Sequence, residues 1–337
     1  MTVTRIFQTT LAALLISSST VFAQPPAAAA AAAPAPPPAF VTQAEAQLRS
    51  GHLDQALAVY RGVLQTSSDS FEANLGAGVV LDLMGQVAAA RTNLEKAIQA
   101  AKTPAARTRA EDAMMVSFAF QNDCTGAVKY VSVMYNRDLD AGQYGAAGQM
   151  ASRLGQLCLD AGDFDAAQQW FRMGYAATLQ QPKLMPPAQN QLDFEWNAAM
   201  AQIDAAQGKR ADKVQPPPKG TGNISAAQYA TEQETAENRV KAARLVLAKD
   251  AGANKAQLEA FLTGSVAFYE GDYKTAAADL QKADQADPLV LALAAQAYEK
   301  LGDKAQATQV YQKIMASTAH TVTNAYARLL AAKAGQK

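Results

Sequence analysis

The sequence predicts an all-α protein assembled from serial helix–turn–helix pairs, and three observations favour this fold class. Hydrophobic residues make up 49% of the 337 positions, yet aromatic residues make up only 7%. Much of the difference is alanine, which loses no side-chain entropy in a helix and therefore favours helices most strongly. Runs of β-branched residues with period-two alternation, which are typical of strands, are missing. A short pattern of glycine, alanine and bulky residues also recurs along the chain.

The charge balance argues against two classes of partner. Lys plus Arg number 30 and Asp plus Glu number 30, so the formal net charge is zero. Nucleic-acid binding proteins carry a basic stripe, and proteins that bind anionic membranes carry polybasic clusters. Neither feature is present, so no nucleic-acid partner is expected.

The first 39 residues are predicted to direct export rather than to fold. Arg5 and the apolar stretch 6–16 precede a small-residue site ending at Ala23, which predicts a signal peptide over 1–23. The alternative is an uncleaved anchor, but the apolar run is shorter than the roughly 20 residues of a spanning helix. Residues 24–39 are rich in Pro and Ala and are predicted to form a disordered tether. The mature chain is expected to be soluble and periplasmic or secreted.

A repeated pattern defines the array that follows. Each copy has a glycine, a large residue two positions later, an alanine five positions later and a bulky residue nine positions later. The first two glycines are 34 residues apart. The copies are Gly51-Leu53-Ala56-Tyr60, Gly85-Val87-Ala90-Leu94, Gly162-Phe164-Ala167-Phe171, Gly271-Tyr273-Ala276-Leu280 and Gly302-Lys304-Ala307-Tyr311, with a degenerate copy at Asn122-Cys124-Ala127-Val131.

This spacing suits two antiparallel helices joined by a short turn. The glycine is placed just after the first helix, where a left-handed residue is needed. An aspartate often follows it and can cap the second helix. The alanine allows close approach, and the bulky residue is expected to fill the space beside a small residue of the first helix, such as Gly78, Gly155 or Gly264. Asp287 and Pro288 open a helix as a cap followed by a first-turn proline.

These copies resemble the tetratricopeptide-repeat family. The best copy runs from Leu291 through Ala294, Ala295, Tyr298, Ala307 and Tyr311, and the resemblance covers most of residues 40–335. The departures are smaller residues in place of the usual tryptophan, Ala267 in place of a tyrosine, and the degenerate copy at Cys124. The resemblance implies a superhelix (α-solenoid) of about six to seven helix pairs with a C-terminal capping helix. It further implies an exported bacterial protein that binds other proteins on its concave face.

The array divides into an N-terminal part over 40–213, a Pro/Gly linker or insertion over 214–225, and a C-terminal part over 226–337. One curved superhelix with a soft hinge near 215–218 is favoured over two separate lobes. Residues 138–145 are either an insertion or an overlong second helix. The first four expected pairs span 40–70, 71–104, 105–140 and 147–181. The fifth consists of a helix over 188–207 and a displaced partner over 226–250. The last two span 255–287 and 288–317, and a capping helix over 324–333 follows.

The two cysteines, Cys124 and Cys158, fall in neighbouring repeats. An exported protein can form a disulfide between them, and the alternative is a pair of small buried thiols. Sequence spacing does not supply the Cα separation that a disulfide needs, so both interpretations stay open.

No constellation of catalytic or metal-binding residues is recognisable. His52 and His320 are the only histidines, and neither has metal-ligand spacing. Asp160, Asp163 and Asp165 form an acidic cluster, but helix capping by Asp163 explains it better than a calcium loop. A non-enzyme without metal or cofactor is therefore expected.

The predicted partner site lies on the first helices of the pairs. Phe261, Phe268 and Tyr269 are the expected hot spots, and the alternative is that such aromatic residues are core. Glu45, Leu75 and Val79 occupy the places where some family members hold a carboxylate, so no carboxylate clamp is expected. The predicted partner-binding residues are Leu75, Val79, Phe120, Phe261, Phe268, Tyr269, Gln296 and Glu299.

The function expected from these features is a non-catalytic scaffold of the cell envelope or secreted space that binds a protein or peptide. The alternative is a module that binds a glycan or another small ligand and serves an envelope enzyme or complex. Aromatic and amide side chains on the inner face would be its signature, namely Trp196, Gln202, Tyr269 and Gln296.

Overall fold

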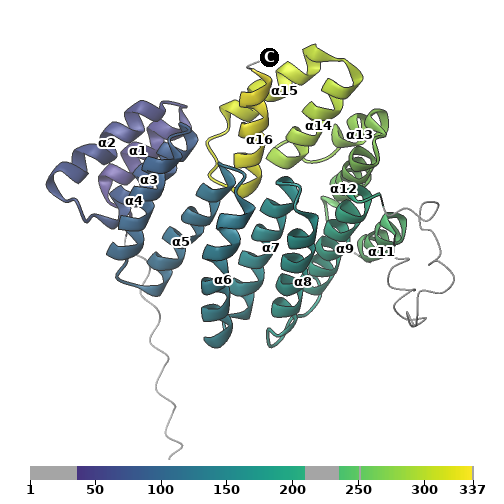
Figure 1. The fold of residues 1–337 in the computed structure, drawn as a ribbon, viewed down its shortest axis with the longest axis horizontal. Coiled ribbons are helices and arrows are strands. Elements are labelled where there is room, and N and C mark those ends of the chain that lie inside the picture. Colours follow the sequence, from purple (N-terminus) through teal and green to yellow (C-terminus); the bar gives the residue numbers. More distant parts are fainter. Residues whose placement is uncertain (1–35, 209–234, 250–251, 336–337) are drawn as a thin grey trace, which may run out of the picture. The chain divides into compact units, whose positions relative to one another are not determined.

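The computed structural model describes residues 36–208, 235–249 and 252–335. All regular elements in these ranges are helices, and none is a strand, which confirms the all-α prediction. The helices follow one another as neighbouring antiparallel pairs (Figure 1). The predicted leader over 1–23, most of the tether over 24–39 and the linker over 214–225 lie outside the described residues. None of the described helices combines the length and apolarity that crossing a bilayer requires.

Four hairpins form the first half of the array. Of the two interpretations of residues 138–145, the structure supports the overlong second helix, because α6 extends to Asp140 and a tight turn follows it. The helices are α1 (Ala39–Arg49) with α2 (Leu53–Thr66), α3 (Phe71–Leu83) with α4 (Val87–Ala100), α5 (Pro104–Ala119) with α6 (Cys124–Asp140), and α7 (Tyr144–Asp160) with α8 (Phe164–Leu179).

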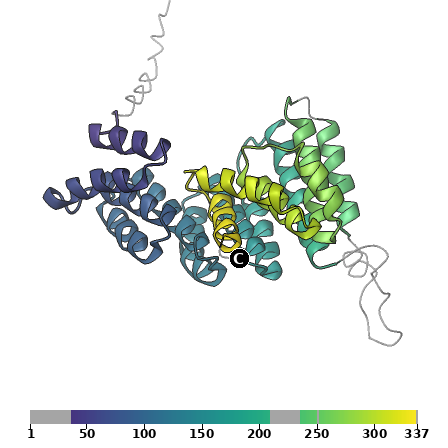
Figure 2. The ribbon, with the colours of Figure 1, turned by 90° about the horizontal axis from the view of Figure 1, so that it is seen from above.

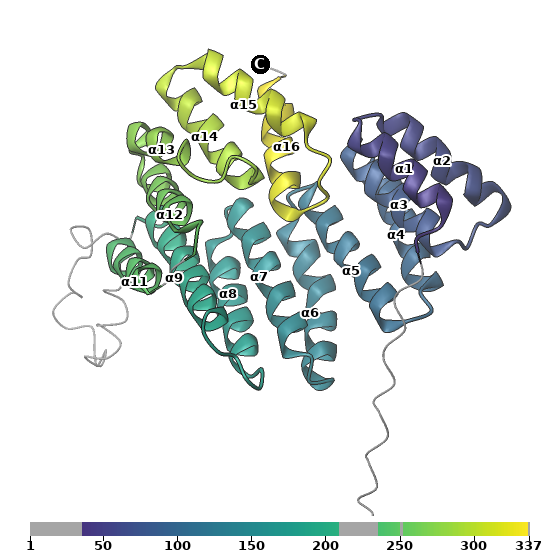
Figure 3. The same ribbon diagram turned by 180° about the vertical axis from the view of Figure 1, so that it is seen from behind.

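The second half continues with one discontinuous pair, two hairpins and a last helix. α9 (Ala188–Ala206) packs against α11 (Ala236–Ala248), as expected of a displaced second helix (Figure 3). The remaining helices are α12 (Lys255–Glu270) with α13 (Tyr273–Leu280), α14 (Pro288–Leu301) with α15 (Lys304–Ala316), and α16 (Val322–Ala334).

The turns within the hairpins have the conformation that the repeat pattern predicts. All five pattern glycines have positive φ, for example 85° at Gly271. Asn122 occupies the same place in the degenerate copy and has φ 56°, a region that Asn tolerates better than most side chains. Asp163, Asp272 and Asp303 each accept a backbone N–H at the start of the next helix. The pattern therefore marks helix ends correctly.

Glycine residues in the first helix let the two helices of a hairpin approach closely. A Cβ atom at Gly155 would lie 2.9 Å from Phe171 Cγ, and one at Gly264 would lie 2.8 Å from Leu280 Cγ. Both distances are too short for ordinary contact between carbon atoms. The bulky pattern residues therefore fill the space opposite small residues of the first helix, as predicted.

The last helix does more than cap the array. α16, yellow in Figure 2, packs on α14 and α15 and also contacts α5 and α7. His320 Nε2 lies 2.9 Å from Asp82 Oδ2, and the His320 ring stacks on Phe120 at 5.5 Å. Arg328 Nη2 donates to the Leu83 carbonyl oxygen at 2.9 Å. These three contacts among Asp82, Leu83, Phe120, His320 and Arg328 are called the C-terminal clasp below.

Candidate partner-binding site

Two of the predicted partner-binding residues, Leu75 and Phe120, are buried. Leu75 packs in a buried cluster with Leu94 and Met114, and Val79 lies partly buried beside it. Phe120 is buried against the ring of His320. Leu75 is therefore a core residue, whereas Phe120, although mostly buried, lines the edge of a shallow surface pocket beside the start of α4.

Phe268, Tyr269 and Gln296 are partly buried by contacts with other side chains, whereas Glu299 is exposed. Phe268 makes edge contacts with the rings of Tyr269 and Tyr273, at 5.5 and 5.8 Å between centroids. Burial raises the pKa of the Tyr269 phenol well above its usual range, with a smaller contribution from the charge of Asp160. Gln296 Nε2 lies 3.3 Å from the hydroxyl of Tyr326 on α16, and Glu299 interacts with Tyr311. The structure therefore does not bring these four residues together with Phe261.

Phe261 lines a cavity that is built mainly by aromatic side chains. This cavity has a volume of about 320 Å³, and its walls come from α7, α8, α9, α12 and α14. Its apolar lining is mostly aromatic, and we call it the aromatic pocket. The rings that define it are Phe171, Tyr175, Phe194, Trp196 and Phe261.

Local packing holds these rings in place. The absence of a side chain at Gly155 leaves room for Phe171 against α7. Tyr175 stacks on Trp196 with 5.1 Å between centroids, and its hydroxyl donates to Asp193 Oδ1 at 2.8 Å. Burial and this hydrogen bond raise the pKa of Tyr175 to about 12. The pocket is therefore lined by a neutral, oriented phenol rather than by a mobile ring.

Polar side chains surround the rings. Arg153 pairs with Asp112 at 3.2 Å, and Gln156 Nε2 donates to Asp160 Oδ1 at 2.7 Å. Gln202 Nε2 donates to Ser265 Oγ at 3.1 Å. An apolar floor with a few fixed polar groups is the arrangement that binds an apolar or aromatic ligand group in one orientation.

The acidic cluster has the local role that the capping interpretation predicts. Asp163 Oδ1 accepts the backbone N–H of Ala166 at 3.1 Å and so caps α8. Asp160 instead ends α7, where burial raises its pKa well above the usual range despite the hydrogen bond from Gln156. Within the ranges that the structure describes, no three potential metal ligands come together.

Cys124 and Cys158 form a disulfide with 4.9 Å between their Cα atoms. Cys124 begins α6 and Cys158 lies near the end of α7, so the bond joins the third and fourth hairpins. It holds α7 to the preceding hairpin, and α7 also provides Ser152, Arg153 and Gln156 to the aromatic pocket.

Sequence reasoning missed most of the aromatic pocket. Phe171 was visible in the repeat pattern, but only as a packing residue. Trp196 and Gln202 carried a signal as an aromatic and an amide on α9, and both line the pocket. No sequence signal identified Tyr175 and Phe194 as pocket residues, because the other pocket residues lie on helices that only the fold brings together.

Comparison with known families supports the repeat assignment at one place. A sequence profile of the tetratricopeptide repeat matches residues 290–318, which cover most of α14 and all of α15. No curated protein matches the chain.

Proposed function

We propose that this chain of helix pairs, in which residues 290–318 match the tetratricopeptide repeat, is a non-catalytic scaffold that binds a protein or peptide of the cell envelope or secreted space. The partner inserts an apolar or aromatic side chain into the aromatic pocket. The observation that carries this proposal is the convergence of five rings from three helices on one cavity of about 320 Å³. Buried aromatic contacts of this kind provide most of the binding energy in protein interfaces.

Two features support an extracytoplasmic location. The first is the leader-like sequence over 1–23. The second is the disulfide between Cys124 and Cys158, because such bonds persist in oxidising compartments and are rare in the cytosol.

Binding of a glycan or another small ligand is a second candidate function. The stacked pair Tyr175 and Trp196 and the amide of Gln202 favour it, because sugars bind through aromatic faces and amide hydrogen bonds. The volume of the pocket is also at the lower end of that found for small-molecule sites.

Site-specific crosslinking from Phe261 tests the proposal. A photoreactive amino acid at position 261 of the full chain in the native host is expected to capture a defined protein. The same residue at Leu245 on α11, whose side chain is exposed, is the matched control and should not capture it.

The variant Phe261→Ala should then weaken binding of the purified partner by about ten- to a hundredfold. Unchanged affinity, or identical adducts from positions 261 and 245, would reject the aromatic pocket as the site. Thermal stabilisation by members of a sugar library, without stabilisation by peptides, would favour the second candidate.

A further inference from the structure

A larger groove lies away from the aromatic pocket, between the second helices α4 and α6, with the first helix α5 as its floor. Its volume is about 1080 Å³. Arg107, Glu111, Met114 and Phe118 line it from one face of α5, at helical spacings of three and four residues. We call it the outer groove. It shares no lining residue with the aromatic pocket.

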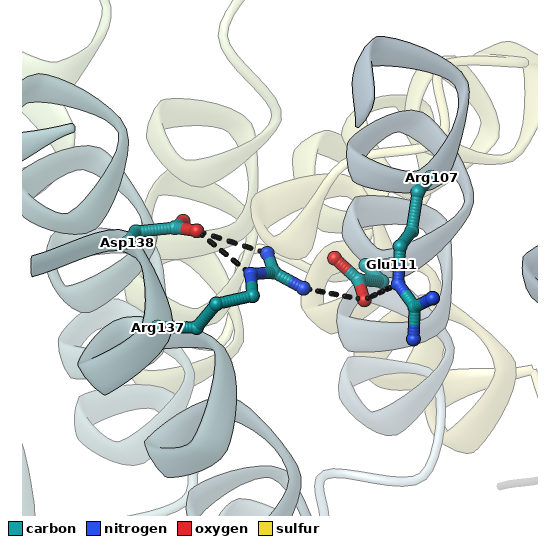
Figure 4. A network of polar contacts seen from close by, with 4 residues as sticks. All are labelled: Arg107, Glu111, Arg137 and Asp138. Atoms are coloured by element: carbon teal, nitrogen blue, oxygen red, sulfur yellow. Dashed lines mark hydrogen bonds and ion pairs between the residues drawn. The ribbon is translucent and has the colours of Figure 1, made fainter. Parts of the chain in front are cut away.

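A charged network crosses this groove. Glu111 Oε1 accepts from Arg107 Nε at 2.9 Å and from Arg137 Nη1 at 2.8 Å (Figure 4). Arg137 also donates from Nε and Nη2 to Asp138 Oδ1, at 3.0 and 2.9 Å. Arg137 therefore spans from α6 to α5. Arg107 uses only Nε on Glu111, so its two Nη groups remain available as donors.

One oxygen of this network lacks a partner. The Glu111 side chain is only 4% exposed, and its Oε2 is buried without a hydrogen bond. A buried carboxylate oxygen left unpaired is costly, because its hydration is lost without replacement. Both arginine donors converge on Oε1 instead. Because Oε2 is buried, a ligand in the groove meets the basic side chains around Glu111 rather than this oxygen.

The other lining residues combine positive charge with apolar surface. Arg91, Lys102, Arg107, Lys129 and Arg137 face three carboxylates, an excess of two positive charges in a chain whose net charge is zero. The Val133 side chain is 71% exposed, although it is a large apolar residue in the middle of α6. The rings of Phe118 and Tyr130, which line the same groove, pack on each other with 5.7 Å between their centroids. Such a surface complements a ligand that is acidic and partly apolar.

We propose that the outer groove is a second docking site, which binds an acidic segment of a partner protein. Carboxylates of that segment bind Arg107, Lys102 and Lys129, and an apolar side chain covers Val133. The site is independent of the aromatic pocket, so either site can fail without the other.

Fluorescence anisotropy with a defined probe tests the proposal on the full chain. The probe is a short acetylated fluorescent peptide of alternating Glu and Leu, and its counterpart has Gln in place of every Glu. The Glu peptide should bind, and the Gln peptide should bind at least about tenfold more weakly. Binding of the Glu peptide should weaken as salt rises, because exposed charges are screened.

Charge reversal locates the site. The double variant Lys102→Glu with Lys129→Glu should weaken binding about tenfold or more. The matched control reverses Lys304 and Lys313, two exposed lysines of α15, and should leave the affinity within about twofold. An equal loss in both double variants would show that only the net charge matters and would overturn the proposal.

Equal binding of heparin, or of anionic phosphatidylglycerol vesicles, would identify a non-specific anion patch and overturn the acidic-peptide assignment.

Discussion

At the residue scale, Gly155 sets the distance between α7 and α8. Replacing it with Ala places a Cβ about where the Phe171 ring now lies, since the ideal Cβ would be 2.9 Å from Cγ. Overpacking of this kind costs roughly 1–3 kcal/mol of unfolding free energy. Because Phe171 also lines the aromatic pocket, Gly155→Ala should reduce partner affinity as well as stability in urea unfolding.

Gly62 provides the matched control for this prediction. It lies within α2, and a Cβ there would meet nothing within 4 Å. Gly62→Ala should therefore stabilise the protein by roughly 0.5–1 kcal/mol, because alanine loses less backbone entropy in a helix. If both substitutions stabilise the protein, the close crossing at Gly155 is not what spaces the two helices.

The pH dependence of stability should depend in part on Asp160. Burial raises the pKa of this carboxyl well above its usual range, and Oδ2 has no hydrogen-bond partner. The folded state therefore holds the proton more tightly than the unfolded state, whose pKa is about 3.9. Stability from this group is present below pH 4 and is lost as the pH rises through the folded pKa.

The variant Asp160→Asn removes this charge and keeps an oxygen for the Gln156 amide. Its melting temperature should exceed that of the wild type at about pH 8, because the unfolded wild type gains a charge there that burial opposes in the folded state. The difference should shrink toward about pH 4, where both side chains are neutral. Calorimetry across this range measures it, and a constant difference would contradict a titrating Asp160.

At the element scale, the disulfide couples the third hairpin to the fourth. The two cysteines that it joins are 34 positions apart in the sequence. Replacing both cysteines with Ala should lower the unfolding free energy by about 2–4 kcal/mol, because the unfolded chain regains freedom. Reductant should destabilise the wild type by a similar amount and leave the double variant unchanged. If reductant does not change the unfolding free energy of the wild type after unfolding and refolding, a stabilising disulfide is contradicted.

Local patterns predict the hairpins but not what the hairpins do together. The spacing from Gly162 to Phe171 predicts both the end of α7 and the packing of α8, because these are contacts between neighbours in sequence. Arg107 and Glu111 alone look like an ordinary pair on one helix face. Their role in the outer groove depends on the tertiary fold, which places Arg137 of α6 within hydrogen-bond distance of Glu111. The aromatic pocket likewise needs Phe261 beside Tyr175, which no local pattern indicates.

At the scale of the whole molecule, the C-terminal clasp makes the second hairpin depend on the last helix. Arg328 donates to the carbonyl oxygens of Met315, Ser317 and Leu83. Arg328→Ala removes the donor of these three carbonyl oxygens and should lower the unfolding free energy by roughly 1–3 kcal/mol. Hydrogen exchange should quicken in α3 and α4, far from the substitution in sequence.

The variant Lys333→Ala is the control, because Lys333 is exposed in the same helix. It should leave exchange in α3 and α4 unchanged. Faster exchange confined to α15 and α16 in Arg328→Ala would show that the bond to Leu83 does not stabilise the second hairpin.

The clasp also bears on the order in which the newly made protein matures. Repeat arrays ordinarily add each unit to the one already formed, since every unit contacts only its neighbours. Here Asp82 finds His320 only after 238 further positions have been synthesised. The contacts of the N-terminal hairpins with the last helix therefore form only after nearly the entire chain has been synthesised. Until then, Phe120 lacks its stacking partner His320. During that interval, the N-terminal hairpins would expose to chaperones the surface that the C-terminal clasp covers in the folded protein.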